Sequence, residues 1–430
     1  MTAVKVANEQ RIPVADVVYR KDLYPRIKQN AETVQKYAAS LDVLPPIEVN
    51  QRLELIDGWH RWTAHKKAEA DTIAVVITET RSDVHLLELA ISRNAKHGLQ
   101  LSESDKEEMA RRIYGDTPYA QRSEKRAELK VLLSTSDASL TRWLSRSDKE
   151  LTERLKRDAF NLWLGCSTQE EIAEAIGVPR QTVTRWIDDF AQTDHLSDLS
   201  KTLAAHMADF EKPIYNIWKQ QDKTPGVTHF GNSEVRWLDN LLYLYTQPFD
   251  IVVDPFAGGG STIDVCRRRM RRFWVSDRKP IVERKDEIRE HDINAGLPKP
   301  PQWKDVRLVY LDPPYWKQAQ GKYSKDPEDL ANMELHQFHQ TLASTVNAFG
   351  KKLPESAAIA LIIQPTQWAA PNHAYTDHIA AMLGAVKLPL DMRFSVPYES
   401  QQYNAQTVEW AKANRRCLVL TREIVVWKVQ

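Results

Sequence analysis

The stretch Ile251-Val-Val-Asp-Pro-Phe-Ala-Gly-Gly-Gly-Ser-Thr262 decides the fold of the last part of the chain. It opens with a short apolar run that predicts a strand ending at Asp254, and a helical pattern begins after the three glycines. Open α/β sheets bind ligands at the carboxyl ends of their strands, where glycines let a ligand approach the backbone beside a helix N-terminus. Taken alone, the turn would suit any nucleotide or would simply close a tight bend.

Other apolar runs of strand length alternate with helical patterns on the carboxyl side of this stretch. They are Phe273 to Ser276, Val306 to Leu311 and Ala357 to Ile363. Such alternation predicts βαβ units and a mostly parallel sheet, which makes this an α/β domain. Two last runs, Cys417 to Thr421 and Ile424 to Val429, are separated only by Arg422 and Glu423, which is too short for a crossover. We therefore expect these two runs to pair as a C-terminal antiparallel hairpin.

A second motif, Asp312-Pro-Pro-Tyr315, follows one of these runs about 50 residues after the glycines. Its prolines lack backbone donors and fix the chain, so the flanking side chains and the carbonyl oxygens are held rigidly. The two motifs, in this order and spacing, resemble the amino-group DNA methyltransferases that use S-adenosylmethionine. Phe256, Gly258 and Gly260 match the FxGxG cofactor motif of that family, and Asp312 to Tyr315 match its DPPY catalytic motif. The resemblance covers about the last 200 residues and implies a Rossmann-like methyltransferase fold.

The resemblance implies catalytic roles for the four residues of the second motif. The Asp312 side chain and the Pro313 carbonyl would accept hydrogen bonds from an exocyclic amine and aim its nitrogen at the methyl group. Tyr315, held by Pro314, would stack on a base flipped out of the duplex. An Asp at the first position is commoner among adenine enzymes, whereas the cytosine enzymes often have Ser, so N6-adenine is favoured over N4-cytosine. Transfer is direct and requires no metal.

The resemblance also implies a set of cofactor-binding residues. They are Asp254, Phe256, Gly258, Gly260, Asp277 and Asp292. Asp277 ends the second strand and is placed for the ribose hydroxyls, whereas Asp292 is placed for the adenine of the cofactor. Two alternatives stay open, because acidic residues at strand ends are often helix caps and Phe256 would equally suit the core.

Length and composition limit what the rest of the chain can be. The 430 residues predict about three domains. With 42% hydrophobic residues, 27% charged residues and a mean hydropathy of -0.51, the composition is that of a soluble globular protein. The absence of an apolar run of roughly 20 residues and of a secretory signal predicts a cytoplasmic protein without a membrane span. The net charge of +1 gives no overall argument for nucleic acid.

The scattered cysteines and a run of arginines each have both a structural and a functional interpretation. Cys166, Cys266 and Cys417 are widely scattered, which predicts buried thiols rather than disulfides or a structural zinc site. The run Arg267-Arg-Arg-Met-Arg-Arg272 would track DNA phosphates, but a charge run on a helix is usually a solvated face, and we favour that interpretation.

The segment from Ser167 to Ile187 has the pattern of a helix, a turn at Gly177 and a second helix. Ser167 or Thr168 would cap the first helix. The side chains predicted to be buried are Ile172, Ala173, Ile176, Val183 and Ile187. The segment resembles a helix-turn-helix, and its second helix would present DNA-binding side chains outward, namely Arg180, Gln181, Thr184 and Arg185. A helical hairpin with a polar face is the alternative, and a similar piece at Ser139 to Leu144 suggests a duplicated hairpin.

The segment Leu55-Ile-Asp-Gly-Trp-His-Arg-Trp-Thr-Ala64 resembles the N-terminal domain of the chromosome-partition family ParB, over roughly residues 10 to 110. The GxxRxxA motif, which cradles nucleotide phosphates in that family, is present as Gly58, Arg61 and Ala64. The companion ENxxR box keeps only Asn94, because Arg93 and His97 replace its Glu and its Arg. This departure favours a scaffold or DNA-facing module, with Arg61 in a structural ion pair, over a CTP site.

These segments predict four parts: a ParB-like domain (1–100), a helical helix-turn-helix region (101–195), a linker (196–226) and the methyltransferase domain (227–430). Together they predict an enzyme that methylates adenine N6 in double-stranded DNA, and they leave a homodimer open. Three alternatives remain: an N4-cytosine enzyme, a DNA-binding regulator with a degenerate methyltransferase domain, and an RNA amino-methyltransferase. The helix-turn-helix opposes the last of these, because it suits the major groove of B-form DNA.

Overall fold

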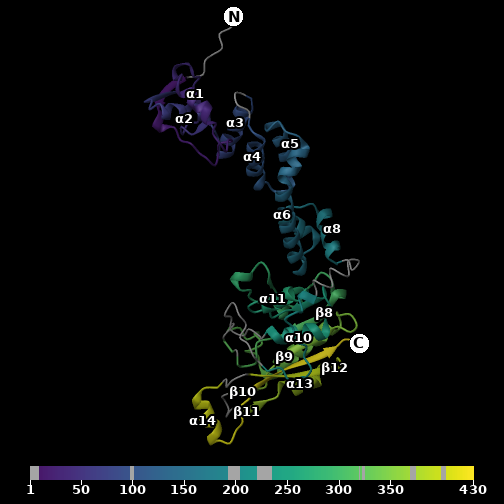
Figure 1. Cartoon of the computed structure of the whole chain (residues 1–430). Helices are drawn as coiled ribbons and strands as arrows, with labels where there is room; N and C mark the ends of the chain where they lie inside the picture. Colours follow the sequence, from purple (N-terminus) through teal and green to yellow (C-terminus); the bar gives the residue numbers. More distant parts are fainter. Residues whose placement is uncertain are drawn as a thin grey trace. The chain divides into compact units, whose positions relative to one another are not determined.

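The structure is a computed structural model, and it describes residues 9–96, 101–191, 204–219, 235–318, 320–321, 325–368, 374–398 and 403–430 (Figure 1). The chain divides into two compact units. The first consists of Met1–Lys156 and Gly177–Pro179, and the second consists of Arg157–Ile176 and Arg180–Gln430. His97 of the altered ENxxR box and much of the predicted linker lie outside the described residues.

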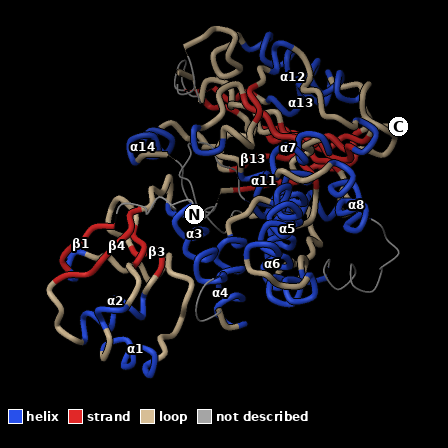
Figure 2. The backbone as a smooth tube through the Cα atoms, turned by 90° about the horizontal axis from the view of Figure 1, so that it is seen from above, coloured by secondary structure: helices blue, strands red, loops and turns tan. Residues whose placement is uncertain are grey.

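A four-stranded sheet with the order β1-β4-β2-β3 opens the first unit. Its strands are β1 (Glu9–Pro13), β2 (Ile47–Val49), β3 (Leu55–Asp57) and β4 (Thr72–Ile77). The pair β2 and β4 is parallel, and the other neighbours are antiparallel. The helices α1 (Ala31–Ala38) and α2 (Trp59–Lys67) lie together on one side of the sheet (Figure 2). Ile47, Val49 and Val75 alternate along their strands and are fully buried, as the apolar runs predicted.

Helices make up the rest of the first unit. They are α3 (Asp83–Lys96), α4 (Glu103–Gly115), α5 (Arg122–Leu132) and the first part of α6 (Asp137–Leu164), with 3-10 turns at Val14–Asp16, Leu41–Val43 and Tyr119–Gln121. Ser102 and Asp105 form a reciprocal capping box that starts α4. The piece Ser139 to Leu144 lies inside α6, a single helix of 28 residues, and its Trp143 is buried in the helical core.

The second unit is built on a seven-stranded sheet with the order β12-β13-β9-β8-β5-β6-β7. Its strands are β5 (Ile251–Asp254), β6 (Arg272–Asp277), β7 (Arg289–Glu290), β8 (Val306–Leu311), β9 (Ala358–Ile363), β12 (Leu390–Pro397) and β13 (Thr421–Lys428). The strands β9, β8, β5, β6 and β7 are parallel, and β13 is antiparallel to both β9 and β12. The predicted α/β fold with a mostly parallel, Rossmann-like sheet is therefore confirmed.

Helices and short elements complete the second unit. They are α7 (Gln169–Ile176), α8 (Arg180–Ala191), α10 (Val235–Tyr245), α11 (Ser261–Arg268), α12 (Leu335–Gly350), α13 (His378–Ala385) and α14 (Ala405–Ala413), the strands β10 (Thr366–Trp368) and β11 (Ala374–Thr376), and 3-10 turns at Val282–Arg284, Ile293–Ala295 and Trp303–Asp305. None of the helices in the described ranges is both long and apolar enough to cross a membrane.

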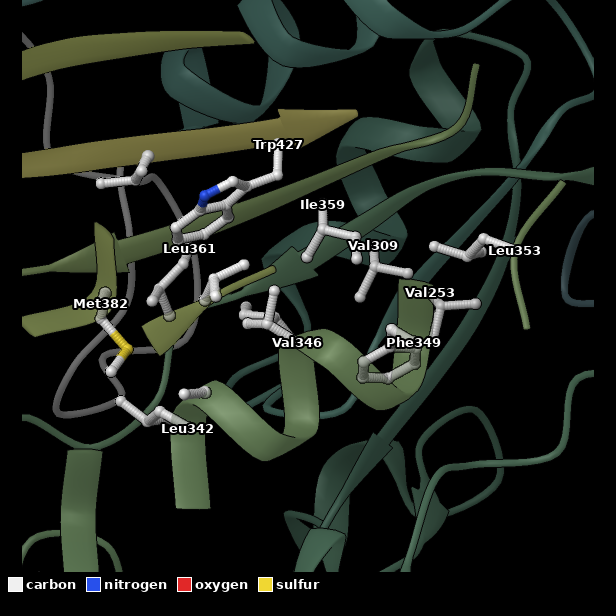
Figure 3. Packing of buried hydrophobic residues seen from close by; sticks show 14 of the residues in the cluster. Val253, Val309, Leu342, Val346, Phe349, Leu353, Ile359, Leu361, Met382 and Trp427 are labelled. Carbon is white, nitrogen blue, oxygen red and sulfur yellow. The ribbon is translucent and has the colours of Figure 1, made fainter. Parts of the chain in front are cut away.

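Two apolar cores cover the two faces of the large sheet. On one face Val253, Val309 and Leu361 pack with Leu342 and Val346 of α12 (Figure 3). On the other face the neighbouring strand residues, among them Val252 and Leu308, pack with α10 and α11. Because the sheet is buried on both faces, its parallel strands are continuous apolar runs, which is the pattern that predicted them.

The prediction that the last two apolar runs pair with each other as a hairpin is wrong. Arg422 and Glu423 lie within the continuous strand β13 rather than in a turn. The antiparallel partners of β13 are β12 and β9, and Cys417 to Leu420 form no strand. A polar pair between two apolar runs is typical of a turn, but here burial of the Arg422 side chain keeps the strand continuous.

Two other predictions are corrected. Cys166 and Cys266 are buried, but Cys417 is exposed. In the arginine run, Arg269, Arg271 and Arg272 are buried, so the run is neither a solvated face nor a phosphate track. Arg269 pairs with Asp239 of α10 at 2.8 Å, and Arg271 donates to the Thr246 carbonyl at 3.0 Å.

Candidate active site

The strand order brings three acidic strand ends to one edge of the large sheet. The central strand β5 has β6 on one side and β8 on the other, so the crossovers diverge between β5 and β8. Asp254 and Asp277 end β5 and β6, and Asp312 follows β8. In open α/β sheets the ligand crevice lies outside the carboxyl ends of the strands at such a switch point. The structure thus brings together both motifs that the sequence analysis selected.

The loop after β5 is held in shape by Asp254. The buried Asp254 carboxylate accepts the Phe256 backbone N–H at 2.9 Å through Oδ1 and the Thr262 hydroxyl at 2.6 Å through Oδ2. Burial raises the pKa of Asp254 to about 7, against the lowering effect of these two hydrogen bonds. Asp254 therefore braces the loop, and Phe256 packs against the apolar core beside it.

Two glycines give this loop a backbone path that other residues avoid. Gly258 has a φ of +50° and Gly260 a φ of +80°, both in the left-handed region. A Cβ at Gly260 would lie 2.8 Å from the Arg284 side chain, which donates to the Gly260 carbonyl at 2.9 Å. Arg284 also pairs with Asp264 of α11 at 2.7 Å. Arg284 thus fastens the loop, and no local sequence pattern indicates this role.

The end of β6 is fastened to the same loop. Asp277 accepts the Gly258 N–H through Oδ2 and the Lys279 N–H through Oδ1, each at 2.9 Å. The Ala257 N–H donates to the Ser276 carbonyl at 3.0 Å. A half-buried carboxylate therefore stands beside the glycine loop, at the N-terminus of α11. Carboxylate oxygens at this position suit ribose hydroxyls, and left-handed glycines beside a helix N-terminus leave room for a nucleotide-like cofactor.

Asp292 lies in a separate charged network. Its Oδ2 pairs with Arg278 Nε at 2.9 Å, and its Oδ1 accepts the Asn294 N–H at 2.9 Å as a cap of a 3-10 turn. Arg278 also pairs with Asp326. Because Arg278 directly follows Asp277, this network lies next to the end of β6 in the chain.

The second motif forms a hydrogen-bonded pair at the end of β8. The Tyr315 hydroxyl donates to Asp312 Oδ1 at 3.0 Å. Burial, with the Asp312 charge as a second cause, holds the pKa of Tyr315 well above its usual value, so the phenol keeps its proton. Pro313 is buried and Pro314 is half-buried. Within the described ranges, no group of three His, Cys, Asp or Glu side chains could hold a metal ion.

The helices α7 and α8 carry the side chains predicted to bind DNA. Thr168 and Glu171 form a reciprocal cap at the start of α7 through bonds of 3.2 and 2.8 Å, and Gly177 turns the chain with a φ of +64°. Ile172, Val183 and Ile187 are buried, whereas Ala173 and Ile176 are only half-buried. On α8, Gln181 and Arg185 are exposed, Arg180 pairs with Glu170 at 2.9 Å, and the Thr184 hydroxyl donates to Gln169 at 2.7 Å.

These helices belong to the same unit as the large sheet, and they are anchored at its amino-terminal edge. Trp163, near the end of α6, contacts Phe249 just before β5 with ring centroids 5.3 Å apart. The guanidinium of Arg272 at the start of β6 lies 4.9 Å from the Trp163 ring. Arg289 at the start of β7 donates to the Gly165 carbonyl at 2.9 Å. The motif Asp312 to Tyr315 lies at the opposite edge.

In the first unit the predicted phosphate-binding residues have partners within the protein. Gly58 has a φ of +103°, and Arg61 donates to the Pro46 carbonyl at 2.7 Å and to Asp57 at 2.6 Å. Asn94 is buried, accepts from Arg26 at 2.9 Å and donates to the Ala90 carbonyl at 2.8 Å.

Comparisons with known proteins agree with the glycine-loop geometry. Residues 183–281 match the model of the N6/N4 methyltransferase family, described as DNA methylase. The match includes the glycine loop and Asp277 but ends before Asp312. None of the curated proteins matches the chain.

Several solved structures are similar to parts of the chain. They include ParB from Caulobacter crescentus complexed to the centromeric parS site, with 17% identity over 46% of this chain and 84% of that chain at a TM-score of 0.20. They also include a SAM dependent methyltransferase from Archaeoglobus fulgidus, with 13% identity over 45% of this chain and 94% of that chain at a TM-score of 0.28. A geranyl diphosphate C-methyltransferase from Streptomyces coelicolor A3(2) shows 11% identity over 45% of this chain and 79% of that chain at a TM-score of 0.26. None of these scores reaches 0.5, so no argument about the chain rests on them. Residues 183–281 of the second unit are therefore similar to the N6/N4 methyltransferase family, and the glycine loop lies within the matched residues.

Proposed function

We propose that the chain is an S-adenosylmethionine-dependent methyltransferase that acts on the exocyclic N6 amine of adenine in double-stranded DNA. The observation that carries the proposal is the convergence of Asp312 and Tyr315 with the glycine loop at one switch point of the sheet. The family match to N6/N4 methyltransferases supports the same chemistry.

The residues around the glycine loop fit the cofactor. S-adenosylmethionine supplies an electrophilic methyl group when it is bound. Gly258 lets it approach the backbone, and Asp277 is the acceptor that we assign to its ribose hydroxyls. Phe256 borders the loop and Asp254 braces it, while Asp292 is assigned to the adenine side through its place after β7 and its ion pair with Arg278.

The residues of the second motif would orient the target amine. The adenine amine is a poor nucleophile because its lone pair is conjugated with the ring. Acceptors on Asp312 and on the Pro313 carbonyl would draw its two N–H groups and make the nitrogen pyramidal. The nitrogen would then take the methyl group as the bond from that carbon to sulfur breaks, and the amine proton would pass to the Asp312 carboxylate that accepts its hydrogen bond. Tyr315 would stack on the flipped base.

The helices α7 and α8 would hold DNA as a helix-turn-helix. Arg180, Gln181 and Arg185 lie on the exposed side of α8, where they suit phosphates and base edges. In the first unit, the internal partners of Arg61 and Asn94 favour a scaffold or DNA-facing role over a nucleotide site around Gly58.

The first test is incubation with labelled S-adenosylmethionine and unmethylated DNA, followed by nucleoside analysis. We expect N6-methyladenine, and we expect Asp312→Ala to abolish transfer while DNA affinity stays largely unchanged. Asp305→Ala is the matched control, because Asp305 is a half-buried carboxylate at the other end of β8. N4-methylcytosine as the product would instead select the cytosine enzyme, and label found only in RNA would refute DNA as the substrate. Wild-type turnover by Asp312→Ala would refute the role of Asp312.

A further inference from the structure

Arg422 of β13 lies beside the catalytic motif, far from it in sequence. Its side chain is buried, with 7% of the residue exposed. Its Nη1 lies 3.5 Å from the Tyr315 hydroxyl oxygen, and that hydroxyl donates to Asp312 Oδ1 at 3.0 Å. A phenol therefore links a buried cation to the carboxylate that we assign to the target amine.

Two aromatic rings fix the position of the guanidinium. Arg422 Cζ lies 4.4 Å from the Trp237 ring centroid and 4.3 Å from the Tyr398 ring centroid. The Tyr398 hydroxyl donates to Gln364 Oε1 at 2.8 Å, just beyond the end of β9. Planar stacking of this kind suits arginine and not lysine. The guanidinium thus lies against one ring from α10 and one ring just after β12, and Gln364 fastens the second ring.

The donors of Arg422 decide the direction of the hydrogen bonds. A guanidinium can only donate, so the Tyr315 oxygen must accept from it and the single phenolic proton must point elsewhere. That proton points to Asp312. Among the described residues, Arg422 Nε has no hydrogen-bond partner, although buried donors are nearly always satisfied. The packing therefore leaves one buried donor unsatisfied while it places another beside Tyr315.

We propose that Arg422 is a positioning residue that acts through the Tyr315 hydroxyl. By donating to that oxygen it directs the phenolic proton to Asp312, and it holds the ring at a fixed angle for stacking on the target base. This inference rests on the proposed function of the site. It assigns no contact between Arg422 and the substrate.

A double-mutant cycle tests this coupling. We would measure single-turnover methyl transfer to DNA for wild type, Arg422→Gln, Tyr315→Phe and the double variant. The phenylalanine keeps the ring and removes the hydroxyl. In the wild-type background we expect Arg422→Gln to slow transfer about ten-fold, the low end for a hydrogen bond to a charged group. In the Tyr315→Phe background we expect less than a two-fold effect, because the atom through which Arg422 acts is absent. Equal effects in the two backgrounds would overturn the proposal.

Two further variants keep the result interpretable. Arg422→Lys keeps the charge and loses the planar stacking, so it should show a smaller loss that also disappears in the Tyr315→Phe background. Arg393→Gln removes an exposed arginine of β12 that pairs with Glu423, and its rate should equal that of wild type in both backgrounds. If Arg422→Gln does not fold, the cycle built on Arg422→Lys decides the question by the same criterion.

A readout that needs no turnover separates this inference from the proposed function. Fluorotyrosine at position 315 reports its surroundings through the 19F chemical shift. We expect Arg422→Gln and Arg422→Lys to move that signal and Arg393→Gln to leave it in place. A wild-type protein that methylates no DNA would refute the proposed function alone, whereas an unmoved 19F signal would refute the contact with Arg422.

Discussion

Asp254 should make the second unit less stable as the pH rises, and Asp254→Asn should remove that dependence. Burial raises the pKa of this carboxyl to about 7 from its ordinary value of 3.8. The folded state therefore binds more protons than the unfolded state between these values. By linkage, the stability that this carboxyl contributes is fully present below pH 4 and is lost as the pH rises to about 7. A shift of about three pH units corresponds to about 4 kcal/mol, of which about 3 kcal/mol falls between pH 5 and pH 8.

Asparagine can keep both hydrogen bonds of the loop, because its amide oxygen accepts from Phe256 and its amide nitrogen can donate to Thr262. The assay is urea unfolding of the full chain at pH 5, 6, 7 and 8, with hydrogen exchange on β5 identifying the transition of the second unit. The free energy of unfolding of Asp254→Asn minus that of wild type should increase by about 3 kcal/mol from pH 5 to pH 8. Asp264→Asn, which removes an exposed acid of α11, should show a difference below about 1 kcal/mol at every pH. A difference for Asp254→Asn that stays constant with pH would refute the buried, proton-binding carboxyl.

Two further predictions concern a histidine pair and the proposed DNA helix. Burial lowers the pKa of His378 to about 4, and its ring bonds His339 and Thr366, each at 2.8 Å. The unfolded state therefore binds a proton that the folded state does not bind. The free energy of unfolding of wild type, measured by urea unfolding, should fall by about 3 kcal/mol relative to that of His378→Gln between pH 7 and pH 4. Parallel pH curves of the two proteins would contradict this prediction. Replacing both Arg180 and Arg185 with Gln should weaken DNA binding, and the slope of the logarithm of the binding constant against the logarithm of the salt concentration should decrease by about two. The single-turnover rate at saturating DNA should change little. An unchanged slope in a salt titration would exclude α8 from the phosphate contacts.

The large sheet was predictable because its strands are buried on both faces. The apolar runs located β5, β6, β8 and β9 to within one residue at each end. Acidic residues directly after such runs, as at Asp254 and Asp312, must reach the same sheet edge when the strands are parallel. The chemistry of that edge was therefore readable from local sequence.

The rest of the site depends on contacts between residues that are distant in the chain. Arg422 resembles a turn residue in the sequence, and only Trp237 and Tyr398 make it a buried strand residue. In the same way, Arg269 belongs to a charge run that suggests an exposed face, but Asp239 provides a buried partner for it. No local pattern reports such a partner, because burial of a charge is decided by tertiary packing.

The position of α8 restricts how DNA recognition and methyl transfer can be combined. The end of α6 packs against α8 through Phe160 and Phe190 and contacts the amino-terminal edge of the sheet through Trp163, whereas Asp312 lies at its carboxyl edge. A strand of six residues such as β8 separates these edges by roughly 20 Å, at about 3.3 Å per residue. One duplex that touches both places would therefore be held by α8 at about six base pairs or more from the methylated base, at 3.4 Å per base pair. Under the proposed function, α8 would therefore fix where the enzyme sits on DNA, but it would not choose between adenine and cytosine. That choice would be made at the carboxyl edge, where Asp312 and Tyr315 would meet the flipped base.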